Sequence, residues 1–174
     1  MRAFVAGGLL MLAGCAALEP APMSTPSLTG VPREFEMAGR LSVRVADRSD
    51  IAKLRWTHRT ASDAWVVSSP VGTEVARIDS DAGGALLRRA SGGDERAPDF
   101  ATLTQRLLGA ALEPAMLSGW LHGAGSTGPA AAGWTVTIDE TQRAGAVELA
   151  RRITATRGDT VVKLVVDSYR ALED

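Results

Sequence analysis

The stretch Phe35-Glu-Met-Ala-Gly-Arg-Leu-Ser-Val-Arg-Val45 alternates in character along its whole length. Its odd-numbered positions are apolar or small, and the even-numbered ones include Glu36, Arg40, Ser42 and Arg44. Successive side chains of a strand point to opposite faces, so the pattern predicts a strand that is buried on one face and exposed to solvent on the other. Such half-buried strands are typical of antiparallel sheets. The stretch therefore indicates a mainly β protein.

The same alternation recurs downstream. The run Ala52–His58 places Ala52, Leu54 and Trp56 on one face. Further strands are predicted at residues 64–68, 73–79, 85–90, 134–139, 147–156 and 160–169, with turn residues at 81–84, 91–94 and 157–159. Gly158-Asp159 between two alternating runs is a hairpin signal. About eight short strands joined by such turns predict one large, curved antiparallel sheet or an incomplete barrel.

Two segments in the middle of the chain have helical spacing instead. Pro98–Gly109 offers Asp99 as an N-cap and Gly109 as a C-cap. Glu113–Leu121 follows, with Pro114 near its first turn. Both segments are rich in apolar side chains, so we expect two short helices to lie across one face of the sheet.

The beginning of the chain indicates export. Residues 1–14 hold one arginine and an apolar run, which is typical of a secretory signal peptide and too short to span a bilayer. Cys15 is the only cysteine, and Leu12-Ala13-Gly14-Cys15 resembles the bacterial lipobox, in which the thiol receives a diacylglycerol. An ordinary signal peptide containing a cysteine is the alternative. In bacterial sorting, Asp after the lipidated cysteine retains a lipoprotein at the inner membrane, so Ala16-Ala17 favours the outer membrane.

The predicted organisation has three parts. Residues 1–14 form the signal peptide, and residues 15–33 form the lipidated N-terminus and a flexible tether rich in Pro, Ser, Thr and Ala. Residues 34–174 form one domain. The localisation that follows is an outer-membrane, lipid-anchored protein that faces the periplasm.

The residues that catalysis or metal binding requires are sparse. The chain has 19 basic and 20 acidic residues and a formal net charge of −1, which gives no sign of a nucleic-acid partner. His58 and His122 stand alone in the sequence, without metal-ligand spacing. Gly123–Gly128 matches G-x-G-x-x-G but lacks the strand before it and the helix after it that a dinucleotide site needs. We therefore expect no enzyme activity, no cofactor and no metal.

Apolar side chains are the more informative feature. The chain has four tryptophans, Trp56, Trp65, Trp120 and Trp134. They fit either an ordinary core or the lining of an apolar pocket, and the sequence pattern leaves both interpretations open.

The segment Ser68-Ser-Pro-Val-Gly-Thr73 predicts a tight turn, because Pro70 fixes the first corner and Gly72 supplies a positive φ. An aliphatic residue, Val71, then occupies the exposed tip. An isolated aliphatic side chain on the surface is common in proteins and would need no functional explanation.

Several segments, read in order, resemble the LolB family of outer-membrane lipoprotein receptors. They are the lipobox at Cys15, Phe35–Leu41, the strand ending in Trp56, Ser69–Thr73, Leu107–Gly109 and Leu117–Gly123. The resemblance implies an open antiparallel half-barrel, LolA/LolB-like, in which short helices form a lid over an apolar cavity. Candidates for the cavity floor are Leu41, Val43, Leu54 and Trp56, and candidates for the lid are Leu103, Leu107, Met116, Trp120 and Leu121, with core packing as the competing explanation for each.

The resemblance also implies a function. The family accepts acylated lipoproteins from a periplasmic carrier, LolA, and inserts them into the outer membrane, without nucleotide or metal. The implied partners are a LolA-like carrier, the acyl chains of cargo lipoproteins and outer-membrane phospholipid, and a monomer is expected. The Pro70-Val71-Gly72 turn matches a protruding family loop that carries a leucine and is implicated in membrane insertion.

This sequence departs from the family pattern twice. Val71 is one methylene shorter than leucine, and the Ala/Gly-rich segment 123–133 is short where the family usually has more sheet. A structural scaffold lipoprotein with a filled sheet core remains the alternative function. A periplasmic hydrolase is disfavoured, because no nucleophile–base pair is evident.

Overall fold

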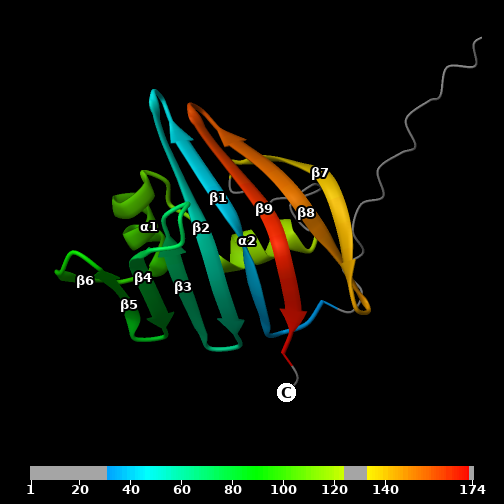
Figure 1. Cartoon of the computed structure of the whole chain (residues 1–174), viewed down its shortest axis with the longest axis horizontal. Coiled ribbons are helices and arrows are strands. Elements are labelled where there is room, and N and C mark those ends of the chain that lie inside the picture. The colour runs from blue at the N-terminus through cyan, green and yellow to red at the C-terminus, as the bar shows by residue number, and fades with distance from the viewer. Residues whose placement is uncertain (1–30, 124–132, 173–174) are drawn as a thin grey trace, which may run out of the picture.

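The computed structural model of this chain describes residues 31–123 and 133–172, which form one open antiparallel sheet with two short helices. The strand order is β6-β5-β4-β3-β2-β1-β9-β8-β7, so β6 and β7 are the two edges. The strands are β1 (Phe35–Val45), β2 (Arg48–Arg59), β3 (Ser62–Ser68), β4 (Glu74–Asp81), β5 (Gly84–Arg89), β6 (Asp94–Ala97), β7 (Thr135–Ala144), β8 (Val147–Arg157) and β9 (Thr160–Ala171). Figure 1 shows the curved sheet, which confirms the predicted half-barrel.

The alternating stretch that opened the sequence analysis is the central strand β1. It pairs with β2 along its whole length, from Phe35 opposite His58 to Val45 opposite Arg48, and with β9 on its other side. Phe35, Met37, Leu41 and Val43 are buried, as the alternation predicted. Its outward positions are partly or fully exposed.

Gly39 marks the one irregularity in the pairing of β1 with β9. The register shifts between Ala38 and Gly39. A Cβ atom built on Gly39 would lie 2.2 Å from the carbonyl oxygen of Val165, well inside van der Waals contact. Only a residue without a side chain allows this close approach of the two strands.

The two helices are α1 (Phe100–Leu108) and α2 (Pro114–Leu121). As predicted, the Asp99 carboxylate caps α1 by accepting a hydrogen bond from the Thr102 backbone N–H at 2.7 Å, and Gly109 ends it with a φ of 77°. Both helices lie against the same face of the sheet, α1 beside β4 to β6 and α2 beside β8 (Figure 1). Over the two described ranges, neither helix has the length and apolarity that crossing a bilayer requires.

We call the helix-covered face of the sheet the inner face and the opposite face the outer face. Inward side chains of the strands and the apolar sides of both helices form one continuous core. All four tryptophans belong to it, with at most 3% of each exposed.

The sequence analysis missed the edge strand β6. Its residues Asp94-Glu-Arg-Ala97 show no apolar alternation, and Asp94 had been assigned to a turn. The strand forms because it extends the sheet beside β5 and because Glu95 binds Arg89 at 2.9 Å and Arg106 of α1 at 2.5 Å. Ion pairs between a strand and a neighbouring strand or helix leave no alternating pattern in the sequence.

Candidate functional site

The turn between β3 and β4 has the geometry that its sequence predicts. The Gly72 N–H donates to the Ser69 carbonyl oxygen at 2.8 Å, and the Ser69 N–H donates to the Thr73 carbonyl oxygen at 2.8 Å. Gly72 has a φ of 97°, which closes the turn after Pro70. Val71 is left 88% exposed at the tip, the most exposed large aliphatic side chain of the described residues.

The residues predicted to line a cavity lie in, or packed against, the hydrophobic core. Leu41, Val43, Leu54 and Trp56 of the sheet are at most 3% exposed, and Leu103, Trp120 and Leu121 of the helices are at most 1% exposed. Leu107 and Met116 are partly buried and pack against the same core. The structure therefore places all nine residues in, or packed against, one buried core.

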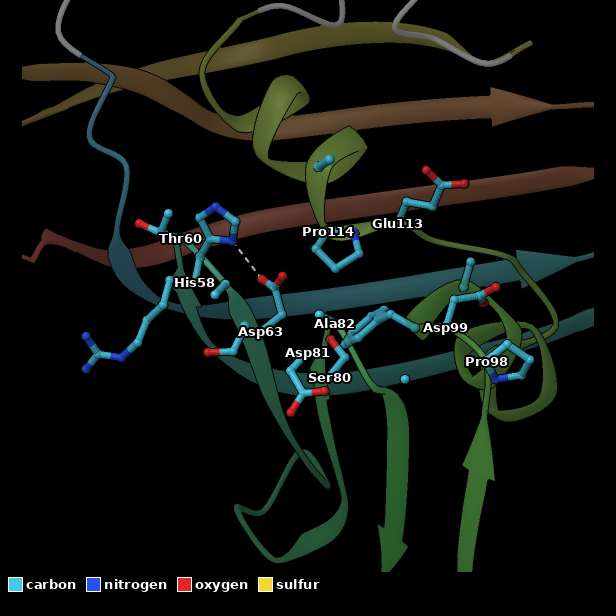
Figure 2. Close-up of a pocket in the computed structure, with 17 residues that line it drawn as sticks. His58, Thr60, Asp63, Ser80, Asp81, Ala82, Pro98, Asp99, Glu113 and Pro114 are labelled. Carbon is cyan, nitrogen blue, oxygen red and sulfur yellow. Dashed lines mark hydrogen bonds and ion pairs between the residues drawn. The ribbon is translucent and has the colours of Figure 1, made fainter.

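A surface hollow of about 550 Å³ opens beside this core (Figure 2). It lies between the β2–β3 turn, the β4–β5 turn and the starts of α1 and α2. Its apolar lining includes Ala61, Ala82, Phe100, Pro114 and Ala115, and its polar lining includes Asp63, Asp81, Asp99 and Glu113. None of the nine predicted residues lines it. Sequence patterns contained no signal for this hollow, because its walls come from four segments with no shared motif.

One wall of the hollow holds a hydrogen-bonded trio. Asp63 Oδ1 accepts a hydrogen bond from the buried Trp56 Nε1–H at 2.7 Å. The same oxygen lies 2.7 Å from His58 Nδ1 (Figure 2). His58 and Asp63 face each other across β2 and β3. His58 is thus partnered, unlike the isolated strand-end residue that its sequence position suggested, and the trio fixes the side chains at the mouth of the hollow.

The second histidine is buried at the end of α2. His122 Nδ1 lies 2.8 Å from the Ser118 carbonyl oxygen, and His122 Nε2 lies 2.9 Å from the Tyr169 hydroxyl. Since a carbonyl can only accept, Nδ1 carries the proton and Nε2 accepts from Tyr169. Burial lowers the pKa of His122 and raises that of Tyr169. This neutral pair ties the second helix to strand β9.

Neither histidine completes a metal site. Among residues 31–123 and 133–172, no group of three or more His, Cys, Asp or Glu side chains is placed to hold a metal ion. Cys15, the predicted signal peptide, most of the predicted tether and nearly all of the Gly-rich segment 123–133 lie outside the described residues.

The chain is similar to a known set of lipoproteins over almost its whole length. A sequence profile of the family described as "Outer membrane lipoprotein LolB" matches residues 33–169. The outer-membrane lipoprotein LolB of Azoarcus sp. (strain BH72) is 30% identical, over 98% of this chain and 94% of that protein. That of Thiobacillus denitrificans is 31% identical, over 92% of each chain. This chain belongs to the LolB family.

Within the described residues of this LolB-family chain, three buried indole groups lack a hydrogen-bond partner. The Nε1–H groups of Trp65, Trp120 and Trp134 are shielded from water and have no hydrogen-bond acceptor within residues 31–123 and 133–172. Trp120 and Trp134 lie edge to face with ring centroids 5.4 Å apart, beside the two ends of segment 123–133. Buried donors are nearly always satisfied in native proteins, so three orphan indoles in one core are unusual. Sequence patterns could not reveal them, because partnering depends on the packed geometry.

Proposed function

We propose that this chain is an outer-membrane lipoprotein that accepts acylated lipoproteins from a LolA-like periplasmic carrier in an apolar cavity and inserts them into the outer membrane. The observation that carries the proposal is the LolB-family match over residues 33–169, on an open half-barrel with two covering helices. In this proposal Cys15 carries the lipid anchor, the domain faces the periplasm as a monomer, and no cofactor, metal, nucleic acid or catalytic residue takes part.

The hollow at the helix starts is the proposed entrance for an acyl chain. Its volume of about 550 Å³ is within the range of small-molecule sites, and its lining is rich in alanine and proline. The acyl chain of the cargo would pass from this hollow onto the inner face, between the floor residues and the lid residues. Exposing an acyl chain to water costs free energy, so each step of the transfer must exchange one apolar contact for another.

Opening would separate α1 and α2 from the strands they cover. The orphan indoles of Trp65, Trp120 and Trp134 support such a second state, because their N–H groups gain nothing from the closed packing. The ester and amide carbonyls of a lipoprotein's acyl groups are acceptors of the kind these donors lack. We infer that a bound acyl group satisfies at least one of them.

The protruding turn is the proposed insertion element. Val71 projects from Pro70 and Gly72 without packing against the core. An exposed aliphatic tip of this kind can enter the membrane interface at little cost to the fold, and its entry would disturb the lipid packing where cargo is released.

A structural scaffold lipoprotein is the competing function, and one observation favours it. The nine residues predicted for the cavity are packed together in a closed core. If the helices never leave the sheet, no acyl chain can enter, and the domain would serve as a rigid lipid-anchored module.

Transfer of labelled cargo separates the two functions. A LolA-type carrier loaded with a labelled lipoprotein is mixed with the domain starting at Ala16, and the label is followed by pull-down. Transfer is expected, and it should be strongly reduced by Ala115→Trp, which fills the hollow from an exposed position. Ser91→Trp in the β5–β6 turn is the matched control and should transfer normally. No transfer to the folded domain from a competent carrier would favour the scaffold.

A further inference from the structure

The outer face carries a concentration of positive charge at its centre. Outward positions of β1, β2 and β9 present Arg40, Arg44, Lys53, Arg55 and Lys163, which we call the basic patch. Asp167 is the one carboxylate among the outward positions of these strands between residues 38–44, 49–55 and 161–167. The whole chain has a formal net charge of −1, so the patch is a local feature and not a consequence of a basic composition.

Most of the patch is not neutralised within the described part of the chain. Arg40 binds Asp167 at 3.1 Å, whereas Arg44, Lys53, Arg55 and Lys163 have no ion pair there. Arg40 and Lys53 are directly opposite each other on β1 and β2. Like charges in opposing strand positions repel, and of these two only Arg40 has a carboxylate partner, so an external anion near Lys53 would relieve the remaining repulsion.

The patch continues into the protruding turn. A hollow of about 410 Å³ on the outer face is lined by Lys53, Arg55 and Gly72, the residue after Val71. Glu74 and Asp167 also line it, but each is engaged by a cation, at 3.8 Å to Arg77 and 3.1 Å to Arg40. The basic patch and the turn therefore share one surface.

Exposed aliphatic residues gather on the same surface. Ile51, Val71 and Val75 are the exposed large hydrophobic residues of the described chain, at 62%, 88% and 43%. Ile51 lies on β2 opposite Ser42, two residues from Lys53, and Val75 begins the outward side of β4 just after the turn. Cations beside exposed aliphatic side chains suit a membrane interface, where headgroup phosphates and the acyl boundary lie within a few ångströms of each other.

We propose that the outer face docks on a bilayer containing anionic phospholipid, with the basic patch against the headgroups and Ile51, Val71 and Val75 at the interface. The proposal rests on the function proposed above, because it gives the lipid-anchored domain a fixed orientation in which the insertion turn meets the membrane. The helix-covered inner face and the hollow at the helix starts then remain open to the periplasm for a carrier.

The test uses the full chain reconstituted in vesicles. An environment-sensitive dye is placed on Ile51→Cys, which supplies the free thiol once Cys15 is lipidated. Vesicles of phosphatidylcholine alone are compared with vesicles that contain phosphatidylglycerol as well. We expect a blue shift of the dye only with the anionic lipid, and we expect it to fade as salt shortens the range of electrostatic attraction.

Charge variants make the test specific to the patch. Each basic residue near an anionic surface contributes roughly fivefold to the binding constant, so Lys53→Glu with Arg55→Glu should lower the docking equilibrium constant at least about 25-fold. Arg96→Glu with Arg143→Glu changes the net charge equally, at exposed positions on the edge strands β6 and β7 that have no ion pair among the described residues. This control should dock like the parent chain. Equal dye signals in neutral and anionic vesicles, or equal losses in both variants, would overturn the proposal.

Cargo transfer with the same variants separates this proposal from the proposed function. If the Lys53→Glu/Arg55→Glu chain still accepts lipoprotein but the parent shows no lipid-dependent shift, only the docking proposal fails. If docking occurs but the parent accepts no cargo, the transfer function fails and docking stands. If the double variant loses acceptance from the carrier while docking is unchanged, the patch binds the carrier and the membrane assignment is wrong.

Discussion

His122, at the end of α2, accepts a hydrogen bond from the Tyr169 hydroxyl of β9 at 2.9 Å. Its other ring nitrogen donates to the Ser118 carbonyl oxygen, so the imidazole is held in one neutral tautomer. His122 is 1% exposed and touches the ring of Phe35 with centroids 5.4 Å apart. The second helix is thereby attached to the sheet by an imidazole whose pKa is lowered by burial.

Stability should therefore fall in mild acid. Burial holds the pKa of His122 below its ordinary value of 6.5, so the unfolded chain binds more protons than the folded one between the two pKa values. The contribution of His122 is complete above about pH 6.5 and is lost as the pH falls through that window. Urea unfolding at pH 7.5 and at successively lower pH should show this decline. His122→Gln should flatten it, and an unchanged slope in that variant would assign the decline to other groups.

The Asp63 carboxylate should stabilise the fold by holding the side chains at the mouth of the hollow in place. Asp63→Ala leaves the buried Trp56 Nε1–H without its acceptor and removes the partner of His58, at an expected cost of about 2 kcal/mol in the free energy of unfolding. Asp63→Asn keeps an acceptor oxygen and should lose less. Chemical denaturation measures both variants, and equal losses would show that charge, and not the hydrogen bond to Trp56, is what Asp63 supplies.

Much of the fold was predictable because its signals are local. The alternation of Phe35–Val45 is strong enough to specify a half-buried strand. Asp99 marks the start of α1 through its capping side chain, and Gly109 marks its end because glycine readily adopts a positive φ. The Pro70–Gly72 turn was predictable for the same reason. Edge strand β6 was not, because Glu95 is held by Arg89 and Arg106, which lie elsewhere in the sequence.

The candidate site was less accessible from sequence. Periodicity identified which face Leu54 and Trp56 occupy, but it could not tell a packed core from a cavity, since both bury the same face. The His58–Asp63 pair had one usable signal: a hairpin centred on residues 60–61 places these residues opposite each other, and Trp56 opposite Trp65. The orphan indoles and the hollow depend on tertiary packing, which leaves no local pattern.

Gly39 should be intolerant of any side chain. In Gly39→Ala, the new Cβ would lie 2.2 Å from the Val165 carbonyl oxygen, so β1 and β9 must move apart. We expect a loss of several kcal/mol, comparable to severe overpacking of a core, or a failure to fold. Ser42→Ala, an outward position on the same strand, is the control and should change stability by less than about 0.5 kcal/mol. Thermal or urea unfolding decides the matter, and a Gly39→Ala protein as stable as the control would contradict the close approach.

Val71 should affect delivery without affecting the fold. Because its side chain is 88% exposed, Val71→Glu should leave the unfolding free energy within about 0.5 kcal/mol of the parent. The same change places a charge where the tip would meet the membrane, so release of accepted cargo into vesicles should fall sharply while acceptance from the carrier stays normal. Val71→Leu adds one methylene, worth about 0.8 kcal/mol of apolar burial, and should raise the release rate by up to about fourfold. Vesicle flotation after transfer measures release separately from acceptance. If Val71→Glu releases cargo as fast as the parent, the exposed valine is an ordinary surface residue, and insertion must rely on another part of the outer face.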